Sequence, residues 1–114
     1  MLLLVEAACA SPAFAHDFGP LVFCDQGTLT NCTNHVDPAF PGDTFSCEGE
    51  VGGVVSCTSQ VSGDNSPYCS YMGNEASSKN RDVYMCGPQS EFSSQTKDEY
   101  WQQMDAAQSQ GVYP

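Results

Sequence analysis

Apolar and β-branched residues recur along this chain in short segments, which are separated by runs of Gly, Asn, Asp, Ser and Pro. Segments of this length that alternate with period two and end in turn-forming residues are typical of β-strands. We therefore expect strands at residues 21–24, 44–51, 54–61, 68–72 and 82–86. The polar stretch 25–43 is predicted to form turns.

The two central segments are predicted to form one β-hairpin, because Gly52-Gly53 between them is a two-residue turn signal. Side chains alternate between the two faces of a strand. Alternation places Glu48 and Glu50 on the solvent face. The residues expected on the inward face include Phe45, Cys47, Val55 and Cys57.

The C-terminal segment changes to helical periodicity. Residues 96–99 read TKDE, a capping box with Thr96 as N-cap and Glu99 at the third helical position. Apolar residues then recur at helical spacing, at Tyr100, Met104 and Ala107. We predict a helix over about 97–109, with this stripe packed on the sheet. Alternatively, the helix is exposed and offers Tyr100 and Trp101 to a partner.

Six of the seven cysteines fall within the predicted β-region, at Cys24, Cys32, Cys47, Cys57, Cys69 and Cys86. Their spacing contains no C-x-x-C, which argues against a zinc ribbon or a thioredoxin-like site. We expect three disulfides, which join sheet to sheet or loop to sheet. Cys24 and Cys32 are candidates for closing a local loop, and the complete connectivity stays open among 15 possibilities. The expected fold is mainly β, a small disulfide-stapled sheet or sandwich with one C-terminal α-helix.

The first 15 residues, MLLLVEAACASPAFA, have the apolar start and the small-x-small sites of a secretory signal peptide. No basic residue precedes the apolar run and Glu6 interrupts it, so the signal is either truncated or degenerate. Cleavage after Ala15 would remove the odd cysteine, Cys9, and leave His16 first. We expect residues 16–114 to form a single disulfide-rich domain, secreted into an oxidising extracellular compartment.

The charge balance is strongly acidic, with 14 Asp and Glu against the three basic residues Lys79, Arg81 and Lys97. Nucleic acids and anionic membranes attract clustered Lys and Arg, so both are disfavoured as partners. The acidic residues are scattered singly, which favours a self-repelling surface and a monomer.

An aromatic residue stands two positions before a cysteine at Phe45-Ser46-Cys47 and at Tyr84-Met85-Cys86. This triplet, with the cysteine content and the signal peptide, resembles the small secreted effector candidates of plant-infecting fungi. Residues i and i+2 of a strand share a face, so ring-to-disulfide packing explains the triplet equally well. The resemblance implies a non-enzymatic protein that binds a host protein or a cell-wall glycan. The aromatic residues expected to contact that partner are Tyr68, Tyr71, Tyr84 and Trp101.

Asn31-Cys32-Thr33 is the N-glycosylation sequon of the chain, and it suits an exposed loop. We expect no cofactor unless His16 becomes the N-terminus. Its amine and imidazole, with His35, would then form a copper-binding histidine brace that resembles lytic polysaccharide monooxygenases.

A small ribonuclease-like protein is a second alternative, and it would recruit Glu48 or Glu50 as base, with Arg81, His35 and His16. The sequence contains no G-x-S-x-G, P-loop or Rossmann motif. Asp64, Asn65 and Asp82 lack EF-hand spacing, and we interpret them as turn residues.

Overall fold

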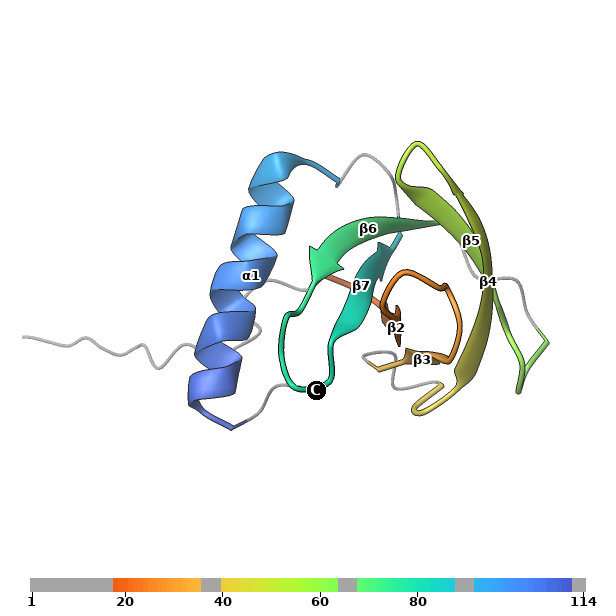
Figure 1. Ribbon diagram of the computed structural model, residues 1–114, viewed down its shortest axis with the longest axis horizontal. Helices are drawn as coiled ribbons and strands as arrows, with labels where there is room; N and C mark the ends of the chain where they lie inside the picture. The colour runs from red at the N-terminus through yellow and green to blue at the C-terminus, as the bar shows by residue number, and fades with distance from the viewer. Residues whose placement is uncertain (1–17, 36–39, 64–67, 88–91, 112–114) are drawn as a thin grey trace, which may run out of the picture. The chain divides into compact units, whose positions relative to one another are not determined.

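The computed structural model describes residues 18–35, 40–63, 68–87 and 92–111. Six antiparallel strands close into a barrel, in which each strand pairs with the next along the chain and the last pairs with the first (Figure 1). The strands are β2 (Leu21–Asp25), β3 (Cys32–Asn34), β4 (Thr44–Val51), β5 (Val54–Ser59), β6 (Cys69–Asn74) and β7 (Arg81–Cys86). The barrel forms one compact unit, Phe18–Ser93, and the helix α1 (Ser94–Ser109) belongs to another.

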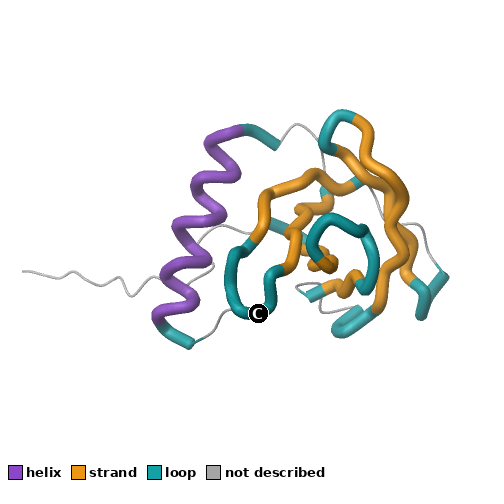
Figure 2. The backbone as a smooth tube through the Cα atoms, in the orientation of Figure 1, coloured by secondary structure: helices purple, strands orange, loops and turns teal. Residues whose placement is uncertain are grey.

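The predicted class, mainly β with one C-terminal helix, is confirmed, and β4 has the predicted bounds. The prediction of turns throughout 25–43 is wrong, because β3 lies within this stretch. Three residues are too short to show an alternation pattern, yet β3 pairs with β2 on one side and β4 on the other. Without β3 the sheet would be interrupted between β2 and β4; with it the sheet closes (Figure 2).

Each disulfide joins two strands that are neighbours both in the sequence and in the barrel. Cys24–Cys32 joins β2 to β3, Cys47–Cys57 joins β4 to β5, and Cys69–Cys86 joins β6 to β7. The last two pairs are directly opposite in register. The expected links from sheet to sheet or loop to sheet are wrong, whereas the local closure by Cys24 and Cys32 is confirmed. The barrel thus consists of three hairpins, each closed by its own disulfide.

These disulfides also fill the barrel. Alternation directs one face of every strand inward, and most of the cysteines lie on that face. The interior cluster consists of Val22, Cys24, Cys32, Phe45, Val55, Cys57, Cys69, Tyr84 and Cys86, with Leu29, Cys47 and Tyr71 packed against it. The predicted inward face of the β4–β5 hairpin is confirmed by this set. Sulfur here replaces much of the aliphatic side-chain volume that a chain of this size would otherwise need.

Strands β2 and β7 are buried on both faces. Val22 and Tyr84 belong to the interior cluster, while Phe23 and Val83, on the opposite face of the same strands, have no exposed area. This double burial explains why β2 reads as a continuous apolar run, LVFC, instead of alternating with polar residues.

Helix α1 begins at Ser94, so the prediction of Thr96 as N-cap is wrong. Residues 93 and 94 are both serines, which also favour helix N-termini, and the helix uses this earlier start. The predicted stripe is confirmed as the buried side of the helix, at Tyr100, Met104 and Ala107. Tyr100 has no exposed area, so the alternative in which it is offered to a partner is wrong.

Candidate functional site

Among the described residues, two of the exposed large apolar side chains lie on one surface, which includes the tip of the β4–β5 hairpin. Val51 is 83% exposed, and Tyr68, just before β6, is 63% exposed. Both border a shallow pocket of about 340 Å³. The residues that line it are Gly49, Val51, Val54, Val55, Ser56 and Tyr68, which we call the hairpin-tip surface. Large exposed apolar groups gathered around one depression are typical of interaction sites.

Local backbone geometry places this surface. Gly52 and Gly53 both have positive φ, 61° and 81°, as a two-residue hairpin turn requires. Val51 and Val54 face each other across that turn, and the register between Glu48 and Val51 is shifted by a bulge. The Tyr71 N–H donates to the Gly53 carbonyl at 3.0 Å, which fixes the turn beside β6. The sequence therefore builds a defined turn with Val51 in solvent and Val54 partly exposed.

The polar groups nearest the hairpin-tip surface in the chain are acidic. Glu48 and Glu50 flank Gly49 on β4 and are both exposed, as predicted. The six lining residues include two hydroxyl groups, on Ser56 and Tyr68, and no histidine, carboxylate or cysteine. The surface thus has apolar contact area with negative charge beside it.

A second cluster surrounds Asp82, inside the barrel wall. Its carboxylate accepts hydrogen bonds from the Gly27 N–H at 2.7 Å, from Asn74 Nδ2 at 3.1 Å and from the Tyr71 hydroxyl at 3.4 Å. Asp82 is 6% exposed and lies in β7, so our interpretation of it as a turn residue is wrong. The signal was present in the sequence, because Asp82, Tyr84 and Cys86 alternate onto one inward face.

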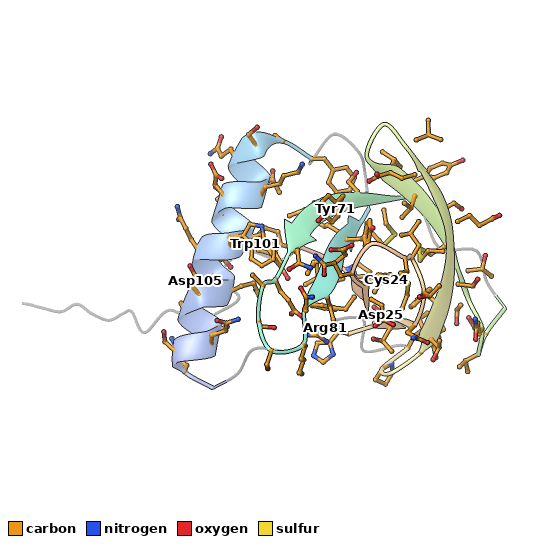
Figure 3. All side chains as sticks on the ribbon, viewed as in Figure 1. Cys24, Asp25, Tyr71, Arg81, Trp101 and Asp105 are labelled. Carbon is orange, nitrogen blue, oxygen red and sulfur yellow. A yellow bond between two sulfur atoms is a disulfide. The ribbon has the colours of Figure 1, made fainter. Side chains whose placement is uncertain are left out.

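The predicted partner-binding role of Tyr84 does not fit its position. Tyr84 is 5% exposed and its ring packs 5.4 Å from that of Tyr71, centroid to centroid. Burial, and then the charges of Asp82 and Glu50, raise the pKa of Tyr84 to about 12. The same causes, together with the hydrogen bond to Asp82, raise the pKa of Tyr71. We correct the prediction accordingly: Tyr84 belongs to the core. Tyr71, which Figure 3 labels, is half-buried and packs against that core.

Of the other two predicted binding aromatics, Tyr68 is on the hairpin-tip surface. Trp101 is half-buried on α1, and its ring meets that of Tyr100 edge-on at 4.8 Å. Of the four predicted residues, Tyr68 therefore presents the largest exposed fraction of an aromatic side chain to a partner.

Arg81 is held by an ion pair on the outer side of β7. Its Nε and second guanidinium nitrogen donate to the two carboxylate oxygens of Glu75, at 2.6 and 3.0 Å, and Glu75 is 8% exposed. The guanidinium carbon also lies 4.3 Å from the centroid of the Phe23 ring. Glu48 and Glu50 are on β4, which does not pair with β7. The arrangement therefore gives no support to the ribonuclease set of residues.

His35 is exposed and meets the Phe23 ring edge-on, with ring centroids 5.7 Å apart. Partial burial, and then the positive charges of Arg81 and Lys79, lower the pKa of His35. His16 lies outside the described residues, so the copper site stays a prediction. The predicted signal peptide, residues 1–15, also lies outside them, as do Asp64 and Asn65.

The sulfurs of Cys24, Cys32 and Cys47 lie within 4.8 Å of one another. All three are oxidised in disulfides, so they carry no thiolate to bind a metal, and their proximity reflects two disulfides packed side by side. Asn31 of the sequon is exposed, with a left-handed φ of 51°, and its side-chain amide donates to Asp25 at 2.6 Å. Its glycosylation stays a prediction.

Searches against protein-family models, curated protein sequences and solved structures found no match for this chain. Among the helices of the described residues, none combines the length and the apolar character needed to cross a membrane.

Proposed function

We propose that this chain is a secreted, effector-like interaction protein that binds an extracellular protein through its hairpin-tip surface and catalyses no reaction. The observation that carries the proposal is the exposure of Val51 and Tyr68 around one shallow pocket. Exposed apolar side chains are costly to keep in water, and an aromatic side chain beside them is the usual anchor of an interface.

Aliphatic side chains favour a protein partner over a glycan. Of the six lining residues, Val51 and Val54 are valines with exposed area, and Tyr68 is the one aromatic side chain. A sugar face stacks on aromatic rings and bonds to polar groups, whereas a protein partner can insert apolar side chains between the valines. We therefore take binding to a cell-wall glycan as an outcome that the experiment must be able to show.

Secretion is part of the same proposal. Three disulfides in a barrel this small supply stability that a short chain cannot obtain from burial alone, and such bonds persist in oxidising compartments. N-terminal sequencing of the protein recovered from culture medium would test this part. Retention of the whole chain inside the cell, with free thiols, would contradict it.

A site-specific photo-crosslinker tests the surface. We would place it at residue 51 or 68, and at Val61 as the matched control, since Val61 is 74% exposed but does not line the pocket. Extracellular protein and cell-wall glycan preparations are the two baits. We expect saturable protein crosslinks from 51 and 68 and none from 61, and at least tenfold weaker binding by Val51→Asp.

Three results would overturn the proposal. These are equal crosslinking from all three positions, crosslinks to the glycan preparation alone, or no saturable binding to either bait. Val51→Asp is suited to this comparison because Val51 is largely in solvent, so its replacement leaves the barrel core unchanged.

A further inference from the structure

Strand β4 is longer than the strand beside it. Its pairing with β3 consists of Thr44 with Thr33 and Phe45 with Cys32, while β4 itself runs on to Val51. Beyond Phe45, the described residues place no strand against the β3 side of β4. The chain turns away at Asn31, whose left-handed φ of 51° ends the extended backbone directly before β3. We call this side of residues 46–51 the β4 edge.

The β4 edge carries backbone groups that point outward. The Cα atoms of Cys47 and Cys57 are 4.0 Å apart, which is the spacing of a non-hydrogen-bonded antiparallel pair. In such a pair the N–H and C=O of each residue point away from its partner. The carbonyl of Asp43, four residues earlier and in the same phase, accepts from the Asn34 N–H on the β3 side at 2.9 Å, which confirms the direction. The N–H and C=O of Cys47 therefore face the β4 edge.

We infer that the β4 edge binds an extended, basic segment of the partner protein by strand addition. The inference rests on the proposed function and specifies how that partner binds. A disulfide holds Cys47 in place, so a segment that pairs with it would not first have to order the strand. Val51, the last residue of β4, also lines the pocket of the hairpin-tip surface, so a side chain at that end of the segment can enter the pocket.

The negative charge beside the β4 edge favours a basic segment as the ligand. Glu48 and Glu50 are exposed on β4, and the whole chain carries a net charge of −11. A segment with Lys or Arg at alternate positions would place cations opposite these carboxylates. A second copy of this chain is disfavoured, because pairing two β4 edges would bring four carboxylates together.

The probe is a synthetic ten-residue peptide of alternating Lys and Val, with an alternating Glu and Val peptide as the control. Two further forms of the basic peptide carry N-methyl groups on every second backbone amide: on the Lys amides in one form and on the Val amides in the other. Only one of these two phases places the methyl groups on the amides that would pair with β4, so one form should not bind and the other should. Binding is measured by fluorescence anisotropy, and exchange of the Cys47 amide by NMR. In the free protein we expect fast exchange at Cys47 and slow exchange at Ser46 and Glu48, which face β5.

With the basic peptide we expect saturable binding, at least tenfold tighter than with the acidic peptide, and at least tenfold slower exchange at Cys47. One N-methyl phase should abolish binding. The variant Glu48→Lys with Glu50→Lys should reverse the preference, whereas Asp98→Lys with Asp105→Lys on α1, the same change of four charges at exposed positions elsewhere, should preserve it.

Failure of this mode is distinguishable from failure of the proposed function. If protein crosslinks form at residues 51 and 68 but the Cys47 amide exchanges equally fast in the complex, the surface stands and strand addition is overturned. Equal binding of both N-methyl phases would also overturn it. So would a concentration-dependent dimer that protects Cys47, since the occupant would then be a second copy. Absence of any binding to baits and peptides would overturn both proposals.

Discussion

Strands β7 and β4 belong to the same barrel but differ in how many of their residues pair with neighbouring strands and in how many of their side chains are buried. β7 pairs with β2 and β6 along its whole length, and nearly all its side chains are buried. β4 pairs with β3 at two positions and leaves most of its side chains in solvent. Buried side chains are concentrated on β7, whereas β4 retains exposed apolar side chains and, at its β3 side, backbone groups that a partner can use. Substitutions should therefore affect stability on the first side and binding on the second.

The largest effect is expected from Arg81→Ala on β7. It leaves the buried Glu75 carboxylate without the guanidinium that neutralises it, and breaking a buried pair in this way costs about 3 to 5 kcal/mol. Urea unfolding measures the loss. Glu48→Ala on β4 is the control, with a change within about 0.5 kcal/mol. Similar losses for the two variants would refute the proposed division between the strands.

The second-largest effect is expected from removing single disulfides, and it should differ between the hairpins. Cys69→Ala with Cys86→Ala opens a loop of 17 residues, and Cys47→Ala with Cys57→Ala one of 10, so each should cost about 3 kcal/mol. The two variants should differ in where the loss of stability appears along the chain. Hydrogen exchange of the β4–β5 hairpin should rise well above the global rate in the second variant, because few ladder pairs hold it to β3 and β6. Uniform exchange across all three hairpins would be the contrary result.

Alkaline pH should destabilise the β7 side. The pKa of Tyr84 is raised to about 12, so between pH 10 and 12 the unfolded chain loses this proton while the folded chain keeps it. The free energy of unfolding therefore falls as pH rises through this window, by up to about 2 kcal/mol after solvent screening. Tyr84→Phe should remove much of this slope, and Tyr68→Phe should not. Tyrosinate absorbance during urea unfolding at pH 9 to 11.5 would measure it.

The smallest expected effect is at the hairpin turn. Gly53 has a φ of 81°, where a Cβ costs about 1 to 2 kcal/mol even though the space around it is open. Gly53→Ala should lower the free energy of unfolding by roughly that amount, and Gly49→Ala, which has no positive φ, by less. Thermal unfolding of the two variants side by side would show whether the turn conformation matters, and equal losses would show that it does not.

Local patterns predicted much of this fold. The alternation of Phe45, Cys47, Val55 and Cys57 and the Gly52-Gly53 turn specified the central hairpin, because these signals act between near neighbours. Closure of the barrel depended on β3, three residues whose strand conformation comes from pairing with β2 and β4 and not from their own propensity. Its pairing could not be read from periodicity.

The candidate site was harder to predict than the fold. Tyr68 was expected to contact a partner, and it lies on the hairpin-tip surface. The sequence predicts a partner contact for Tyr84 as well, but as an inward residue of a doubly paired strand it is buried. The exposure of Val51 depends on the bulge that shifts the register after Glu48. The sequence does not show this bulge, and a valine at the end of a strand is not by itself a signal of exposure to water.

The order of the disulfides has a consequence for biosynthesis. The first cysteine of the barrel bonds to the second, the third to the fourth and the fifth to the sixth, so no bond encloses or crosses another. A chain that enters an oxidising compartment from its N-terminus can complete each bond before the next pair arrives. Correct pairing then requires only the nearest available thiol, and oxidative folding should proceed with little dependence on a disulfide isomerase.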